Sequence, residues 1–215
     1  MKTSLKRELL DHGATVVGIA GLNGYLSGEI SHLDRAVSIG VDRRLNEETL
    51  ALLMKLQKRV VRFLKARGHK ALAIPPDSDR RKDTFISKLY SLFNHKMAAT
   101  SAGLGWIGKN GLLISPSHGP RLSLVTVLTD ARLRPDEPIE HCLCGQCVLC
   151  IDHCPSRAIT GATWSRSAPF VELVRLAECR SHKTTKRQTT GKPNCGLCIN
   201  VCPYGRTKGY QDQVP

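Results

Sequence analysis

The distribution of cysteine constrains this chain more than any other feature of its sequence. All nine cysteines of the 215-residue chain lie between Cys142 and Cys202, and residues 1–141 contain none. The first eight residues, MKTSLKRE, lead into no apolar stretch of the kind that a secretory signal carries. Disulfides are rare in reducing compartments, so the sequence predicts a cytoplasmic protein whose cysteines are metal ligands rather than disulfide partners.

The spacing of the cysteines identifies the metal. The first group follows the pattern Cys-x2-Cys-x2-Cys-x3-Cys-Pro, the run that holds 4Fe-4S clusters in bacterial ferredoxins. Its members are Cys144, Cys147, Cys150 and Cys154. In two-cluster proteins the fourth cysteine of such a run binds the other cluster, so a second group is expected downstream. The last three cysteines of the pattern recur at Cys195, Cys198 and Cys202, and Cys179 replaces the missing first one.

We therefore predict two 4Fe-4S clusters with interleaved ligands. The first cluster takes Cys144, Cys147, Cys150 and Cys202. The second cluster takes Cys154, Cys179, Cys195 and Cys198. Paired Cys-x2-Cys units also build four-cysteine zinc sites, but zinc does not require a third cysteine at the next step followed by Cys-Pro. Cys142 is left over, and we favour a spare, semi-buried thiol over an exchangeable ligand.

The residues before the cysteines have the pattern of a mixed α/β (α+β) domain. Apolar runs at 15–20, 36–41, 71–74, 111–114 and 121–129 predict strands. Segments 46–67 and 84–101 have helical periodicity, and Thr3 is expected to cap a short helix that carries Leu5 and Leu9. We place a boundary in the Pro- and acid-containing segment 134–138. The division is then an α/β domain at 1–138 and a ferredoxin-type cluster domain at 139–215.

The charge of the chain suggests an anionic partner. The formal net charge is +14, and half of the excess lies between 175 and 208, where Glu178 is the only acidic residue. The basic residues there are Arg175, Arg180, Lys183, Lys186, Arg187, Lys192, Arg206 and Lys208. One interpretation is a docking face for tRNA or an acidic electron donor. The other is that these cations offset the charge of the clusters and tune their potential. No apolar run is long enough to predict a membrane span.

Three glycines match a nucleotide-binding pattern in the wrong context. Gly103, Gly105 and Gly108 fit G-x-G-x-x-G, which in dinucleotide-binding proteins follows a strand and opens a helix. Here a predicted helix precedes the glycines and an extended segment follows them. A tight crossover turn, or a backbone that approaches a flat ligand, accounts for the glycines better.

Several segments together resemble the epoxyqueuosine reductase family and, through it, the reductive dehalogenases. They are AGLGWIGKN at 102–110, LLI at 112–114, LVTVLTD at 124–130 and the two cysteine groups. The resemblance implies a nitroreductase-like, corrinoid-binding α/β domain followed by a ferredoxin-like domain with two 4Fe-4S clusters. It further implies that the clusters reduce a base-off cobalamin to a low-valent cobalt that acts on the substrate. The loop that would approach the corrinoid consists of Gly103, Leu104, Gly105, Trp106, Ile107, Gly108 and Lys109.

The proton donor is the main departure from that family. The resemblance implies an acidic residue about a dozen positions before the AGLGW motif, where this chain has Leu89, and residues 84–129 contain no acid. His95 is therefore the candidate catalytic proton donor, because its pKa range suits the task. A structural histidine is the alternative role, and Tyr90 and Lys96 are weaker candidates.

Two functions follow from these observations. The first is a short, cytoplasmic, cobalamin-dependent oxidoreductase that resembles epoxyqueuosine reductase, an enzyme of tRNA modification. Its partners would be tRNA and an electron donor such as flavodoxin or ferredoxin. The alternative is a non-catalytic, ferredoxin-like electron-transfer protein that docks a partner through its basic face. Corrinoid binding separates the two.

Overall fold

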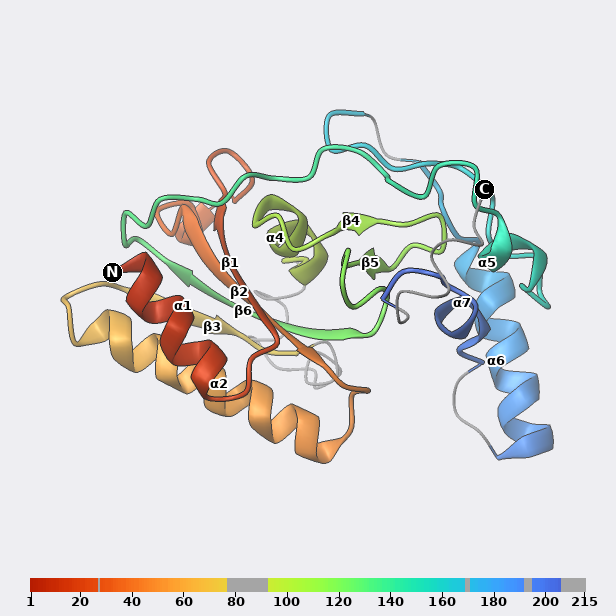
Figure 1. Cartoon of the computed structure of the whole chain (residues 1–215), viewed down its shortest axis with the longest axis horizontal. Coiled ribbons are helices and arrows are strands. Elements are labelled where there is room, and N and C mark those ends of the chain that lie inside the picture. Colours follow the sequence, from red (N-terminus) through yellow and green to blue (C-terminus); the bar gives the residue numbers. More distant parts are fainter. Residues whose placement is uncertain (27, 77–92, 169–170, 192–194, 206–215) are drawn as a thin grey trace. The chain divides into compact units, whose positions relative to one another are not determined.

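The computed structural model describes residues 1–26, 28–76, 93–168, 171–191 and 195–205 and divides the chain into two compact units (Figure 1). The first unit comprises residues 1–104 and 122–139, and the second comprises residues 105–121 and 140–215. The break after Ile139 lies beside the predicted boundary at Pro138. The structure differs from the prediction for residues 105–121, which group with the cysteine-rich region.

The first unit is built on a four-stranded sheet in the order β1-β2-β6-β3, with all neighbours antiparallel. Its strands are β1 (Val16–Gly21), β2 (Arg35–Asp42), β3 (Ala71–Ile74) and β6 (Leu122–Thr129). Four predicted strands are thus confirmed. In the central strand β2, Val37 pairs with Ile19 of β1 and Val127 of β6. Because the central strands are covered on both faces, β6 is a continuous apolar run without clean alternation.

Helices cover both faces of this sheet. The helices α1 (Lys2–Asp11) and α2 (Glu47–Lys65) share one cluster of buried side chains with β1, β2 and β6. The helix α4 (His95–Ser101) packs against alternate residues of the same strands in a separate cluster. The short 3-10 helix η1 (Gly28–Ile30) follows β1. The described part of the predicted helix at 84–101 is α4, and residues 84–92 lie outside the described residues.

The ends of the helices follow from local hydrogen bonds. Asn46 caps α2 by accepting a 2.8 Å hydrogen bond from the Thr49 backbone N–H, as its residue type favours. The predicted cap of the first helix is wrong: Met1, not Thr3, precedes α1. The helix α1 already begins at Lys2, whose amine forms an ion pair with Asp136, so Thr3 lies within its first turn.

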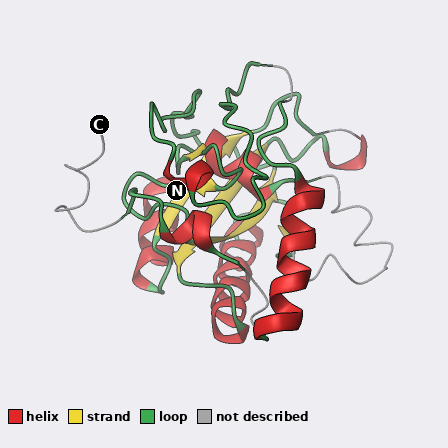
Figure 2. Cartoon of the chain, turned by 90° about the vertical axis from the view of Figure 1, so that its right-hand side faces the viewer, coloured by secondary structure: helices red, strands yellow, loops and turns green. Residues whose placement is uncertain are grey.

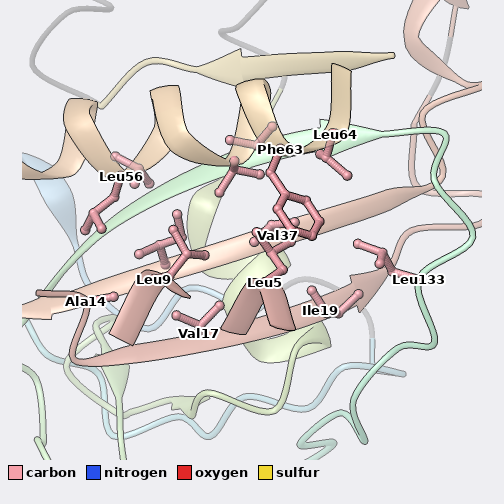
Figure 3. Close-up of a cluster of buried hydrophobic side chains, with 14 of the residues drawn as sticks. Leu5, Leu9, Ala14, Val17, Ile19, Val37, Leu56, Phe63, Leu64 and Leu133 are labelled. Atoms are coloured by element: carbon pink, nitrogen blue, oxygen red, sulfur yellow. The ribbon is translucent and has the colours of Figure 1, made fainter. Parts of the chain in front are cut away.

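The larger hydrophobic cluster lies between α1, α2 and the sheet. Figure 3 shows Leu5 and Leu9 of α1 and Phe63 of α2 meeting the strand residues Val17 and Val37. Leu5 and Leu9 are fully buried, and Phe63 is 8% exposed. Burial of each such side chain stabilises the fold by roughly 1.5–3 kcal/mol. The first unit therefore has its own hydrophobic core.

Asp136 fixes the segment that leads out of the first unit. Its carboxylate accepts hydrogen bonds or forms ion pairs with Lys2 at 2.7 Å, Lys6 at 2.6 Å and the Ile19 backbone N–H at 2.8 Å. Its own backbone N–H donates to the Ile19 carbonyl at 2.8 Å. Burial works to raise the pKa of Asp136, but the bonds from Lys2, Lys6 and Ile19 outweigh it and lower that pKa.

The second unit has short elements and long connections. It contains the hairpin β4 (Trp106–Ile107) and β5 (Leu113–Ile114), and the helices α5 (Leu149–Asp152), α6 (Leu176–Thr190) and α7 (Leu197–Asn200). Of the predicted strand at 111–114, only the last two residues are extended. None of the residues in its three helices is buried. Figure 2 distinguishes the helices, strands and loops of the chain by colour. In the whole described chain, no helix is long and apolar enough to cross a membrane.

Candidate functional site

The second unit gathers the four cysteines assigned to the first cluster. They line one pocket together with Lys109 and Asn110 of the β4–β5 hairpin. Burial and then the negative charges of the neighbouring thiolates raise the pKa of Cys150 to about 12. Among the neighbouring thiolates, those of Cys144, Cys147 and Cys202 raise this pKa most. The thiol of Cys150 is therefore surrounded by the other three members of its set.

The four cysteines assigned to the second cluster also come together. Burial and then the charges of Cys179, Cys195 and Cys154 raise the pKa of Cys198. Cys154 is the last cysteine of the first run, yet its charge raises the pKa of Cys198 in the second set. Its Sγ lies 3.6 Å from the Ser156 hydroxyl, so this sulfur has a local hydrogen-bond partner. The structure thus brings the members of each predicted set together, and one cysteine of each set comes from the other run.

The donor chemistry of both sets suits a cluster. Among the described residues, no three His, Cys, Asp or Glu side chains converge on a single metal ion. A cubane holds its four cysteines at the corners of a larger body, so its ligands lie further apart than those of zinc. Without iron, burial first and then repulsion from the neighbouring thiolates raise the pKa of Cys150. Iron binding would remove that repulsion and release the protons.

Two adjacent residues of the hairpin hold the two cysteine loops. The Nζ of Lys109 donates to the carbonyls of Gly145 at 2.8 Å and Cys147 at 3.1 Å, in the loop of the first set. The Nδ2 of Asn110 donates to the carbonyl of Cys198 at 3.1 Å, in the loop of the second set. Both side chains are 7% exposed. These bonds explain why residues 105–121 group with the cysteine-rich region.

Trp106 supplies an unpaired donor beside the first set. Its indole N–H is buried and has no hydrogen-bond acceptor of standard geometry in the described chain. It nevertheless lies near enough to the Cys144 sulfur to lower the pKa of that thiol. A cluster sulfur at this position would give the indole the acceptor that it lacks. The first set therefore fits a 4Fe-4S cluster on the chemistry of its surroundings as well as its ligands.

The environment of Cys144 favours the thiolate. A hydrogen bond from the Cys142 thiol is the largest influence on Cys144 and, against the effect of burial, helps to lower its pKa to about 6. The Trp106 N–H and the Lys109 amine contribute in the same direction. The same hydrogen bond raises the pKa of Cys142, so the ninth cysteine is a protonated donor beside the first set.

Tyr204 completes the wall of this pocket. Its ring packs edge-on against Trp106, with centroids 4.8 Å apart, and its hydroxyl donates to the Leu143 carbonyl at 2.7 Å. Burial and the nearby thiolates, Cys144 foremost, raise the pKa of Tyr204. Neither Tyr204 nor Asn110 was predicted as a site residue. Two signals in the sequence could have identified them. Tyr204 directly follows Cys-Pro, and Asn110 directly follows Lys109.

The predicted corrinoid loop is packed largely against its own chain. A Cβ on Gly105 would overlap the Ile114 carbonyl, and one on Gly108 would lie 2.6 Å from Ile114 Cγ1. Gly103 has a φ of +68°, which favours glycine. Gly105, Trp106, Gly108 and Lys109 are buried, whereas Gly103, Leu104 and Ile107 are half-buried. A tight turn explains the glycines. The strand β4 lies between Gly105 and Gly108, and β5 rather than a helix follows them, unlike a dinucleotide-binding loop.

His95, the candidate proton donor, occupies a structural position in the first unit. It is 5% exposed, its Nδ1 lies 2.8 Å from the Thr126 hydroxyl, and its Nε2 lies 2.9 Å from the Pro75 carbonyl. Both ring nitrogens are thus used within the chain, which favours the structural alternative. Lys96 lies in the first turn of the same helix, and its backbone N–H donates to the side chain of the capping residue Asn94. Tyr90 and Leu89 lie outside the described residues.

Comparisons of sequence agree with this site. Residues 143–205 match the family described as a 4Fe-4S double cluster binding domain. The chain is 41% identical over 128 residues to an epoxyqueuosine reductase from Synechococcus sp. (strain RCC307), covering 56% of this chain and 37% of that protein. It is 34% identical over 220 residues to one from Synechocystis sp., covering 93% of this chain and 65% of that protein. The chain therefore corresponds to part of each relative, and its cysteine sets are those of a two-cluster 4Fe-4S protein.

Comparisons of structure extend the similarity to the fold of the whole chain. An epoxyqueuosine reductase solved with an epoxyqueuosine-modified tRNA stem loop superposes with a TM-score of 0.70 at 17% identity, covering 96% of this chain and 66% of the other. A catabolic reductive dehalogenase superposes with a TM-score of 0.71 at 20% identity, covering 97% and 32%. The mixed α/β fold with a cluster domain is thus shared with both groups of proteins.

Proposed function

Because this chain resembles epoxyqueuosine reductases over 93% of its length, we propose that it is an iron–sulfur reductase that passes electrons through two 4Fe-4S clusters to a cobalamin. The observation that carries the proposal is the pair of interleaved cysteine sets held by Lys109 and Asn110. These two residues fix both ligand loops to one hairpin, so the clusters keep a constant separation.

The two cysteine sets are neighbours, which suits transfer between the clusters. Cys198 of the second set contributes to the raised pKa of Cys150 in the first set, so their charges act on each other directly. A 4Fe-4S cluster accepts one electron at a time, and the surrounding chain sets its potential through burial, charge and hydrogen bonds to sulfur. Trp106, Lys109 and the Cys142 thiol are the groups that perform this task at the first set.

The proposed place of the cobalamin is the first unit. Of the predicted corrinoid loop, Gly103 and Leu104 belong to this unit, and both are half-buried. A bound cobalamin would supply the reductive chemistry at the substrate. We include no proton donor in the proposal, because the ring nitrogens of His95 are already hydrogen-bonded. A nitroreductase-like arrangement of this unit is part of the same proposal.

The proposed substrate is tRNA that carries epoxyqueuosine, and the proposed compartment is the cytoplasm. The substrate follows from the names of the relatives and from the solved reductase with a modified tRNA stem loop. The proposed compartment agrees with nine cysteines that form no disulfide in the described chain, a state that a reducing environment preserves. An electron donor such as flavodoxin or ferredoxin would reduce the clusters.

An anaerobic titration tests the corrinoid proposal. Cluster-loaded protein is mixed with cob(II)alamin, the EPR spectrum is recorded, and co-elution is checked by gel filtration. We expect binding, with loss of the nitrogen splitting that marks the base-on form. Absence of binding while both clusters are intact would contradict the proposal. Reduction of epoxyqueuosine in a tRNA stem loop, followed by mass, then tests the substrate.

The second candidate is a non-catalytic electron-transfer protein. The basic helix α6, which buries none of its residues, favours it as a docking surface for a partner. The same titration separates the candidates, because an electron-transfer protein of this kind would bind no corrinoid and would keep both clusters.

A further inference from the structure

The helix α6 joins the second cysteine set to a strongly basic surface. It spans Leu176–Thr190, carries the ligand Cys179 in its first turn and buries none of its residues. Its cations are Arg180, Lys183, Lys186 and Arg187, and Glu178 is its only acid. From Arg180 to Arg187 the charges extend over about 10 Å of the helix, at 1.5 Å per residue.

The lysines lie on the same face of α6 as the cysteine. Lys183 and Lys186 follow Cys179 by four and seven residues, the spacing of neighbours along one face of a helix. Cys179, Lys183 and Lys186 are all half-buried, whereas Arg180 and Arg187 are exposed beside them. The basic surface is thus continuous with the ligand of the second cluster.

These cations do more than offset the charge of the cluster. An oxidised 4Fe-4S cluster with four thiolates carries about −2, which is less than the charge of the four basic residues. Lys109 shows how this chain ties down a cation beside a cluster: it is buried and donates to two carbonyls. In the described residues, Arg180, Lys183, Lys186 and Arg187 form no ion pair. The side chains of Arg180 and Arg187 are exposed, so their charges face solvent.

We propose that this face of α6 is the docking surface for an acidic one-electron donor protein that reduces the second cluster. One electron leaves the reduced flavin or iron–sulfur centre of the donor and enters the cluster, and no bond or proton is exchanged. A redox protein gains from docking beside a cluster ligand, because electron transfer requires short distances. A nucleic acid gains nothing from that position. The inference rests on the proposed function only in requiring a redox-active second cluster.

Charge reversal on α6 tests the surface in the cluster-loaded, full-length protein. Reduced flavodoxin serves as the acidic probe, and cluster bleaching is followed by anaerobic stopped flow at low ionic strength. We expect the Lys183→Glu/Lys186→Glu variant to lower the second-order rate constant at least tenfold, because steering by opposite charges contributes about 10- to 1,000-fold. Added salt should slow the wild type and leave the variant nearly unchanged.

The matched control reverses the same number of charges elsewhere. Lys55 and Lys58 lie on the exposed face of α2, and we expect Lys55→Glu/Lys58→Glu to change the rate constant less than about twofold. The EPR intensity of each variant after complete chemical reduction verifies that both clusters are present. If the α6 lysine variant loses a cluster, Arg180→Glu/Arg187→Glu provides the deciding rate, because those side chains are exposed.

Two results would overturn the proposal. One is a rate constant that does not depend on the charge of α6. The other is weakened binding of a tRNA stem loop in a gel shift with an unchanged rate of reduction, which would identify α6 as a nucleic-acid surface. The rate is measured without corrinoid or tRNA substrate. A failure of the docking surface is therefore distinguishable from a failure of the proposed reductase activity.

Discussion

The first unit is stabilised by buried apolar side chains, whereas the second unit has few of them. Both hydrophobic clusters of the described chain lie in the first unit. In the second unit the helices α5, α6 and α7 bury no residue. Among its described residues the buried apolar side chains, cysteine aside, are those of Trp106, Leu113, Ile114, Pro120, Ala158, Ile159 and Pro203. Burial accounts for the fold of the first unit, and metal–thiolate bonds must account for that of the second.

The largest expected effect is loss of a ligand in the second unit. The Cys198→Ser variant should lose the second cluster, because the remaining three sulfurs no longer complete its ligand set. We expect amide protection to collapse in residues 140–205 and to persist in β2 and β6 of the first unit. Iron analysis and hydrogen exchange measure the two effects. Cys142→Ser is the control and should keep both clusters. If the amides around Cys195 stayed protected from exchange in a variant without clusters, the fold of the second unit would not depend on metal–thiolate bonds.

The reverse experiment weakens the core of the first unit. Leu64 is fully buried in α2, so Leu64→Ala should lower the free energy of unfolding by about 2–5 kcal/mol. Denaturant unfolding followed by far-UV circular dichroism gives this value, and visible absorbance should show intact clusters below the transition. Met54→Ala on the same helix, where Met54 is 39% exposed, should cost about 0.5 kcal/mol or less. If the two substitutions lowered the free energy of unfolding equally, apolar burial would not be the main source of stability of the first unit.

A smaller effect is expected at Asp136, where charge rather than apolar burial stabilises the first unit. Asp136→Asn removes an acceptor shared by Lys2, Lys6 and Ile19, at a cost of about 1–3 kcal/mol near neutral pH. Because folding lowers the pKa of Asp136, its contribution is present above the unfolded value of about 3.9 and disappears as pH falls through the folded value. Urea unfolding at several pH values should show the two proteins converging in acid. Asp11→Asn is the exposed control, and a difference that grows in acid would refute the assignment.

The smallest expected effect is a shift in the potential of the first cluster on replacement of Trp106. Trp106→Phe removes the buried N–H that faces Cys144, so the reduced cluster loses a stabilising hydrogen bond. We expect a more negative potential, by up to a tenfold change in the equilibrium constant or about 59 mV. An EPR-monitored redox titration measures it, with Trp164→Phe in the same unit as the control. An unchanged potential would show that the indole N–H does not act on the first cluster.

What the sequence predicts well is what local pattern determines. The spacing of the cysteines predicts two clusters, and runs such as 36–41 predict the strands, because these signals lie within a few residues of one another. The bonds of Lys109 and Asn110 join residues 36 and 88 positions apart, so no local pattern reveals them. For the same reason, the position of β6 between β2 and β3 follows only from the folded sheet. His95 illustrates a chemical ambiguity, since the same side chain serves as a proton donor or as a buried bridge.

The interleaving of the two cysteine sets has a consequence for the biogenesis of the protein. Cys154 leaves the run that supplies the first set, and Cys202 returns from the run that supplies the second. Neither cubane can be closed by a contiguous stretch of chain, so the first one inserted already constrains the ends of the other. From the proposed ligand assignment we therefore expect the two clusters to be loaded cooperatively.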